Sequence, residues 1–131
     1  MKKEIIAVDL FCGAGGLTRG LLDAGIKVKK GYDIDPNLKE TYEKNNEGTE
    51  FFQKDISILK GEEILKELDR ANKFFLLAGC APCQPFSIIN KKNATGDKRK
   101  NLILEFARLI KETRPDFILM ENVPGLKKTK G

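Results

Sequence analysis

A cysteine between two prolines is the residue of this chain best suited to covalent chemistry. Cys83 stands in residues 79–87 (GCAPCQPFS), directly after the apolar run of residues 74–78. The run predicts a strand, and Pro82 and Pro85 stiffen the turn that follows it. The thiol sulfur is therefore expected at the end of a sheet, where a thiolate can act as a nucleophile.

The sequence contains no histidine, so any reactive cysteine must be activated by another group. The absence of histidine excludes Ser-His-Asp triads, Cys-His pairs and His-bearing zinc sites. Cys80 and Cys83 have the CxxC spacing of redox sites, and with Cys12 they offer three metal ligands. A structural zinc site needs a fourth ligand, and a redox site leaves the two motifs described next unexplained. We interpret Cys12 and Cys80 as small buried packing residues.

Two further motifs also follow apolar runs. Residues 9–16 (DLFCGAGG) form a glycine-rich turn, and residues 121–125 (ENVPG) follow the last run. Glycines let a backbone turn tightly and approach a ligand, and Asp33, after the second predicted strand, can hold ribose hydroxyls. The pattern is typical of a nucleoside pocket, although such a turn is as often a structural connection between strand and helix.

Strands and helices must alternate to position these motifs. Asp35 and Pro36 indicate a helix start, whereas Gly25 and Pro115 indicate helix ends. The pattern predicts an α/β fold with a parallel sheet covered by helices on both faces, and all three motifs at the carboxyl ends of its strands. The predicted strands are 5–10, 27–32, 51–53, 74–78 and 117–120, and the helices are 17–24, 36–45, 62–68 and 102–110, with a polar loop at 90–100.

The composition fits one soluble domain of 131 residues, with 40% hydrophobic and 33% charged residues. No apolar run has the length of a membrane span, no secretory signal is apparent, and three cysteines do not suggest a disulfide framework, so we expect a cytoplasmic protein. The net charge of +5 suits a polyanionic partner, although many soluble proteins have lysine-rich surfaces.

Together the three motifs resemble those of the C5-cytosine-specific DNA methyltransferases, from Val8 to Gly125. These enzymes transfer a methyl group from S-adenosyl-L-methionine to carbon 5 of cytosine. The resemblance implies a Rossmann-like methyltransferase fold with five strands in the order 3-2-1-4-5. It also implies a role in DNA methylation, most typically in a prokaryotic restriction-modification system.

The resemblance assigns roles to the motif residues. Cys83 would attack carbon 6 of cytosine, and Glu121, as a buried carboxyl with a raised pKa, would act at ring nitrogen 3. The substrate-binding residues implied are Gln84, Ser87, Arg99 and Asn122. The cofactor-binding residues implied are Phe11 and Asp33 for adenine and ribose, Gly13, Gly15 and Gly16 for the methionine moiety, Asp55 and Ile56 beside the adenine, and Leu17, Ile34, Pro82 and Leu102.

One residue departs from the family pattern. The family usually has glutamate at the ribose position, where this chain has the shorter Asp33. By spacing alone, Asp55 is equally well explained as a helix cap. Family members also continue beyond the ENVPG motif into a target-recognition domain and C-terminal motifs.

Residues 1–131 are therefore expected to form the N-terminal part of the catalytic domain, inactive without a C-terminal half or complementary subunit. The expected substrate is duplex DNA with a flipped cytosine, contacted by the lysine-rich loop after Cys83. Alternatives are an RNA (tRNA) cytosine-5 methyltransferase and a non-catalytic subunit of a split enzyme.

Overall fold

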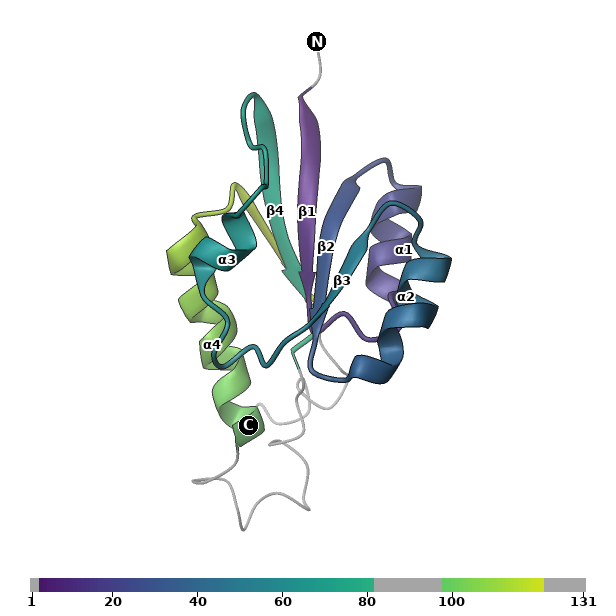
Figure 1. Ribbon diagram of the computed structural model, residues 1–131. Helices are drawn as coiled ribbons and strands as arrows, with labels where there is room; N and C mark the ends of the chain where they lie inside the picture. Colours follow the sequence, from purple (N-terminus) through teal and green to yellow (C-terminus); the bar gives the residue numbers. More distant parts are fainter. Residues whose placement is uncertain (1–2, 82–97, 122–131) are drawn as a thin grey trace, which may run out of the picture.

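The computed structural model describes residues 3–81 and 98–121, leaving aside the side chains of residues 98–101. In this part of the chain, five parallel strands form one sheet in the order β3-β2-β1-β4-β5 (Figure 1). The predicted fold class and strand order are confirmed. The strands are β1 (Glu4–Leu10), β2 (Lys27–Asp33), β3 (Glu50–Gln53), β4 (Lys73–Gly79) and β5 (Phe117–Met120). The helices are α1 (Gly16–Asp23), α2 (Lys39–Asn45), α3 (Gly61–Leu65) and α4 (Lys98–Thr113), with a 3-10 turn (Pro36–Leu38) before α2.

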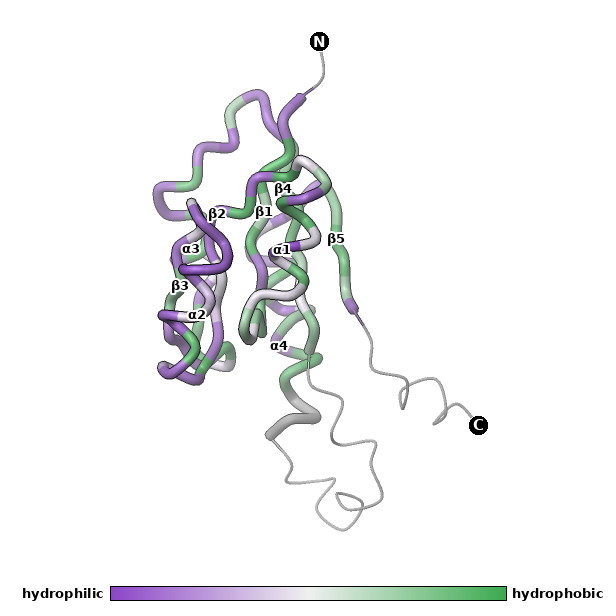
Figure 2. The backbone as a smooth tube through the Cα atoms, turned by 90° about the vertical axis from the view of Figure 1, so that its right-hand side faces the viewer, coloured by the Kyte–Doolittle hydropathy of each residue, from purple (hydrophilic) through white to green (hydrophobic). Residues whose placement is uncertain are grey.

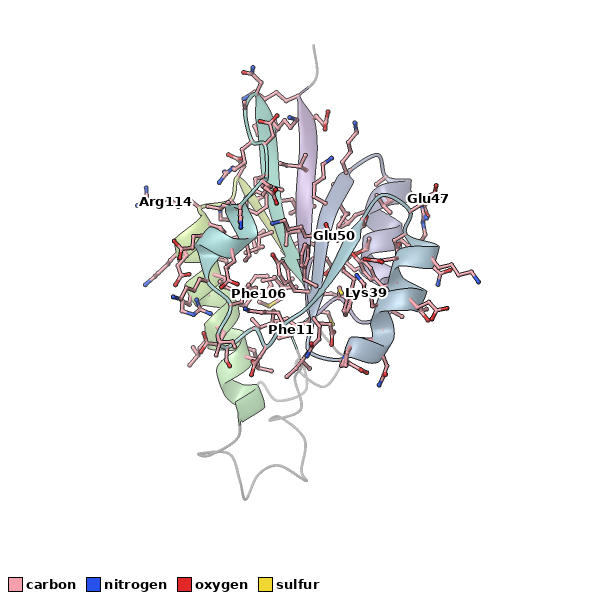
Figure 3. The ribbon with its side chains drawn as sticks, in the orientation of Figure 1. Phe11, Lys39, Glu47, Glu50, Phe106 and Arg114 are labelled. Carbon is pink, nitrogen blue, oxygen red and sulfur yellow. The ribbon has the colours of Figure 1, made fainter. Side chains whose placement is uncertain are left out.

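The central strand β1 separates two hydrophobic cores. Side chains alternate between the faces of a strand, so residues 6, 8 and 10 pack in a cluster with Phe106 and Leu109 of α4. Phe106 lies between α4 and the sheet (Figure 3). On the opposite face, Ala7 packs with Leu21 of α1. Helices α1 and α2 thus cover one face and α3 and α4 the other, as Figure 1 shows.

A glycine of the cysteine motif allows β1, β4 and α4 to meet. A Cβ atom on Gly79 would lie 2.6 Å from the Phe106 ring and 2.7 Å from the carbonyl oxygen of Leu10. Both distances are shorter than contacts that real Cβ atoms make, so a side chain at this position would push α4 away from the sheet. Gly79 therefore serves packing directly before the cysteine-containing segment.

Two helices differ from their predicted ranges. Helix α3 ends at Leu65 rather than Leu68, because Lys30 of β2 donates to the carbonyl oxygens of Glu63, Ile64 and Lys66 and so closes its last turn. Helix α4 begins at Lys98, within the predicted polar loop. Its first residues are polar, but lysine and arginine are good helix formers, so the helix extends ahead of its apolar face.

Strand β5 forms an exposed edge of the sheet. It pairs with β4 on one side, and no other described strand pairs with it. Its apolar character is visible along the trace in Figure 2, where β1 and β4 are also hydrophobic. The exposed fractions of its residues are 48% for Phe117, 51% for Ile118, 40% for Leu119 and 37% for Met120. None of the helices in the described ranges is long and apolar enough to cross a membrane.

Candidate functional site

A pocket with a volume of about 220 Å³ lies at the carboxyl ends of four neighbouring strands. Ligands of open α/β sheets bind at this end, beside the point where the strand order reverses, here between β1 and β4. Apolar side chains and two carboxylates form its walls. The lining residues are Phe11, Asp33, Ile34, Asp55, Ile56, Cys80 and Leu102. All except Cys80 were predicted as cofactor-binding residues.

Phe11 is held in an unusual backbone conformation at this pocket. Its φ is +56°, in the left-handed region that non-glycine residues seldom adopt. The flanking backbone fixes this conformation, because the Cys12 amide donates to the Tyr32 carbonyl at 3.0 Å and the Cys80 amide to the Leu10 carbonyl at 3.3 Å. Backbone strain of this kind is concentrated at ligand sites. The partly buried Phe11 ring packs against the α4-side core and forms one wall.

The glycine-rich turn is joined to the pocket through Asp33. The amide of Gly13 donates to Asp33 Oδ2 at 2.9 Å, so the end of β2 fixes the turn that follows β1. Gly15 precedes α1 with a φ of +98°, and a Cβ there would lie 2.9 Å from the Tyr42 ring. A Cβ at Gly13 or Gly16 would instead meet no atom within 4 Å. The turn thus leaves open space above its first and last glycines.

The two pocket carboxylates also organise their own turns. Asp33 Oδ1 accepts from the Asp35 amide at 3.1 Å. Asp55 Oδ1 accepts from the amide and the hydroxyl of Ser57 at 2.9 and 2.7 Å. Each carboxylate oxygen has two lone pairs, and each oxygen of Asp33 accepts one of the bonds described here, so these bonds orient Asp33 without exhausting its capacity to accept hydrogen bonds.

The buried carboxyl of this region is Asp9 rather than Glu121. Burial raises the pKa of Asp9 to about 7, the hydrogen bond from the Thr18 hydroxyl at 2.7 Å opposes the rise, and the charges of Glu121 and Asp33 add to it. Asp9 Oδ1 is buried without a hydrogen-bond partner in the structure. Glu121 was predicted to be buried, but it is exposed, since no described strand covers β5.

The raised pKa of Asp9 predicts a stability that falls as the pH rises. An unfolded aspartate has a pKa near 3.9, so between about pH 4 and pH 7 the folded chain binds more protons than the unfolded one. The free energy of unfolding should then decrease by at most about 1.4 kcal/mol per pH unit in this window. Asp9→Asn should flatten this slope in urea unfolding measured from pH 5 to pH 8. Equal slopes for the two proteins would contradict the assignment.

Some predicted site residues lie away from the pocket. Leu17 packs against the core on the α1 face, and Gly16 is an exposed residue at the start of α1. Arg99 is in the first turn of α4, and nothing is described of its side chain. The predicted residues that lie outside the described ranges are Pro82, Cys83, Gln84, Ser87 and Asn122.

Cys80 corrects one expectation and adds one residue to the site. It was predicted to be a buried packing residue like Cys12, which is indeed buried. The structure places Cys80 partly exposed in the pocket wall, directly after β4. The sequence signal for this role is its position two residues after the predicted strand 74–78.

The sequence model of the C-5 cytosine-specific DNA methylase family matches residues 5–131. The chain is 51% identical to the type II methylase M.HgiDII of Herpetosiphon aurantiacus over 92% of its length, and 36% identical to the type II methyltransferase M1.HphI of Haemophilus parahaemolyticus over 91%. It spans about a third of the length of both relatives, 33% and 32%.

Solved structures show the same similarity. A protein assigned as a DNA modification methyltransferase, encoded within an E. coli prophage, superposes with a TM-score of 0.78 at 35% identity over 94% of this chain and 33% of that one. The Dnmt2 methyltransferase of S. pombe superposes with a TM-score of 0.70 at 26% identity, over 98% of this chain and 37% of that one.

Proposed function

The chain belongs to the C-5 cytosine-specific DNA methylase family, and we propose that it forms the N-terminal part of a catalytic domain that methylates carbon 5 of cytosine in DNA. The match over residues 5–131, with a pocket at the strand ends, carries this proposal. Because the chain spans a third of its relatives, we propose that target recognition is supplied by a C-terminal half or a complementary subunit. A restriction-modification system in the cytoplasm is the setting that fits the type II relatives.

The pocket fits the adenosine part of S-adenosyl-L-methionine. Phe11, Ile56 and Leu102 offer apolar surface to an adenine ring, whereas Asp33 offers a carboxylate to ribose hydroxyls. The space above Gly13 and Gly16 leaves room for a methionine chain beside the turn. When bound, this cofactor supplies an electrophilic methyl group. The chain's own residues then orient it and exclude water from its apolar surface.

We propose that Cys83 activates the cytosine. Its thiolate adds to carbon 6, and the ring electrons shift so that carbon 5 becomes nucleophilic. Glu121 supports this by a hydrogen bond or proton at ring nitrogen 3. After carbon 5 has taken the methyl group and S-adenosylhomocysteine is left, water takes the proton on carbon 5, which restores the double bond and releases the thiolate. Cys83 is thus regenerated, and the proton held at ring nitrogen 3 returns to the carboxylate of Glu121.

The register of β4 and β5 supports the proximity of the two catalytic motifs. Gly79 of β4 pairs with Met120 of β5, and the Glu121 amide donates to the Gly79 carbonyl at 2.9 Å. The cysteine-containing segment therefore follows the carboxyl end of β4, and the glutamate follows the carboxyl end of the adjacent strand β5. We propose that base flipping brings the cytosine to these carboxyl ends, where Gln84, Ser87, Arg99 and Asn122 contact it.

The test requires an extended protein, namely this chain joined to the segment that follows it or to the corresponding segment of the H. aurantiacus relative. We expect it to transfer tritiated methyl groups from S-adenosylmethionine to duplex DNA, as 5-methylcytosine. Methyl transfer to tRNA but not to duplex DNA would show that the substrate is RNA. S-adenosylmethionine binding without transfer to either would favour a non-catalytic subunit.

Asp33 provides a sharper test of the cofactor pocket. In the extended protein, Asp33→Ala should raise the Kd for S-adenosylmethionine by about tenfold or more, because a hydrogen bond to a charged group is worth about 1.5–3 kcal/mol. Asp23→Ala is the control, since Asp23 is exposed at the end of α1 and pairs with Arg19. Calorimetric titration measures both. If the two variants had equal affinities for S-adenosylmethionine, Asp33 would not be a cofactor-binding residue.

A further inference from the structure

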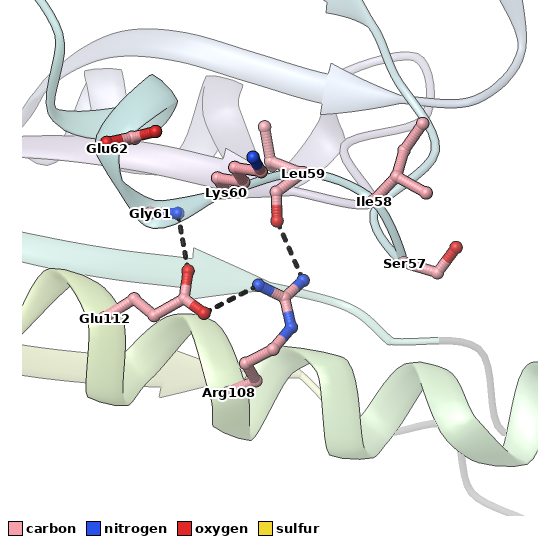
Figure 4. Close-up of a pocket in the computed structure, with 8 residues that line it drawn as sticks. All are labelled: Ser57, Ile58, Leu59, Lys60, Gly61, Glu62, Arg108 and Glu112. Carbon is pink, nitrogen blue, oxygen red and sulfur yellow. Dashed lines mark hydrogen bonds and ion pairs between the residues drawn. The ribbon is translucent and has the colours of Figure 1, made fainter.

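Arg108 of α4 occupies a hollow between this helix and the segment that follows β3. The hollow has a volume of about 710 Å³ and is lined by residues 57–62 together with Arg108 and Glu112 (Figure 4). Arg108 Nη2 donates to the carbonyl oxygens of Ile56 at 3.1 Å and Leu59 at 2.8 Å. Its guanidinium therefore bonds to backbone directly beside the cofactor pocket.

Glu112 completes a clamp on the same segment. Its Oε2 accepts from Arg108 Nη1 at 3.0 Å, and its Oε1 accepts from the Gly61 amide at 2.7 Å, as Figure 4 shows. The Gly61 hydrogen bond and then the Arg108 hydrogen bond lower the pKa of Glu112, so its carboxylate stays charged. A Cβ on Gly61 would lie 2.5 Å from Glu112 Cβ, so the approach of the two elements requires glycine.

The clamped segment forms part of the pocket wall. Asp55 and Ile56 line the pocket, and no described strand pairs with the segment between β3 and α3. Leu102, one of the other walls, belongs to α4 itself. Helix α4 therefore contributes one wall directly and holds another through Arg108.

We propose that Arg108 is a positioning residue for the cofactor, which fixes the wall formed by Asp55 and Ile56 against the wall formed by Leu102. The inference rests on the proposed function of the pocket. A guanidinium is suited to this role because its planar fork bonds several oxygens at fixed angles, whereas a lysine ammonium is a single flexible point of charge. The Arg108→Lys variant should therefore hold the pocket wall in position only in part.

Arg70 offers a matched control. It also donates to two backbone carbonyls, those of Thr113 at 2.8 Å and Arg114 at 3.0 Å, but at the far end of α4 and outside the pocket lining. Arg70→Ala and Arg108→Ala should both lower the melting temperature of the extended protein. Only Arg108→Ala should also raise the Kd and KM for S-adenosylmethionine, by about 10- to 100-fold, with kcat at saturating cofactor nearly unchanged. Arg108→Lys should give an intermediate Kd.

Amide hydrogen exchange provides a readout that does not depend on catalysis. Arg108→Ala should accelerate exchange at Leu59 and Gly61, and Arg70→Ala should not. If the extended wild-type protein binds S-adenosylmethionine but Arg108→Ala and Arg70→Ala have equal affinities for it, the positioning role is wrong while the proposed function stands. If the wild-type protein does not bind the cofactor at all, the proposed function fails, and the positioning role with it.

Discussion

Cys83→Ser in the extended protein should abolish methyl transfer while cofactor binding persists. A serine hydroxyl is essentially un-ionised at neutral pH, so it cannot add to carbon 6 of cytosine as a thiolate can. Loss of a nucleophile typically costs at least about 10³-fold in rate. A tritiated-methyl assay measures transfer, and calorimetric titration measures the affinity for S-adenosylmethionine.

Cys80→Ala is the control for this experiment. Because Cys80 lines the pocket, the variant should bind S-adenosylmethionine slightly more weakly and retain most of its transfer rate. Substantial methyl transfer by Cys83→Ser would contradict the assignment of Cys83 as the nucleophile. A comparable loss of activity in both variants would instead revive a joint role of the CxxC pair.

The 131 residues alone should self-associate and show no detectable methyl transfer. Strand β5 has exposed apolar side chains and an edge with which no strand of the described ranges pairs, and such an edge favours association with other chains. We expect weak or undetectable binding of S-adenosylmethionine by the isolated chain, and activity when the C-terminal segment is supplied. Sedimentation velocity, calorimetry and the methyl-transfer assay measure these three properties.

A substitution on β5 tests whether the self-association of the isolated chain and its lack of methyl transfer have separate causes. Ile118→Lys places a charge at a side chain that is 51% exposed, so it should make the isolated chain more monomeric without restoring transfer. Robust catalysis by the 131 residues alone would show that the C-terminal segment is dispensable. A monomeric wild-type chain would show that the β5 edge does not drive association.

Local sequence patterns predicted the fold closely where each element is determined by its own residues. The range of β5 agrees at both ends, and the apolar stripe of α4 identified Phe106 and Leu109, both fully buried. The end of α3 was missed because it depends on Lys30 of β2, which donates hydrogen bonds to the last carbonyl oxygens of the helix. Such a contact between distant segments leaves no periodic signal.

The residues that line the pocket could also be predicted in large part from the sequence. The resemblance to the methyltransferase motifs identified six of its lining residues. Strand ends alone indicated Asp33 and Asp55, because the carboxyl ends of parallel strands lie together. The titration of Asp9 was missed because it depends on complete burial and on neighbouring carboxylates. The hydrogen bond from Arg108 to Ile56 was missed because it joins two residues that lie 52 positions apart in the sequence.

The central position of β1 has a consequence for biosynthesis. Ile6 pairs with Lys27 of β2, which the ribosome releases soon after β1, whereas Glu4 pairs with Lys73 of β4, which emerges much later. Contacts between distant segments form slowly because a long loop must close first. We therefore expect the nascent chain to pass through a stage in which β1–β3 are assembled and apolar β1 is a temporary edge. We expect this interval of translation to be when the protein depends most on chaperones.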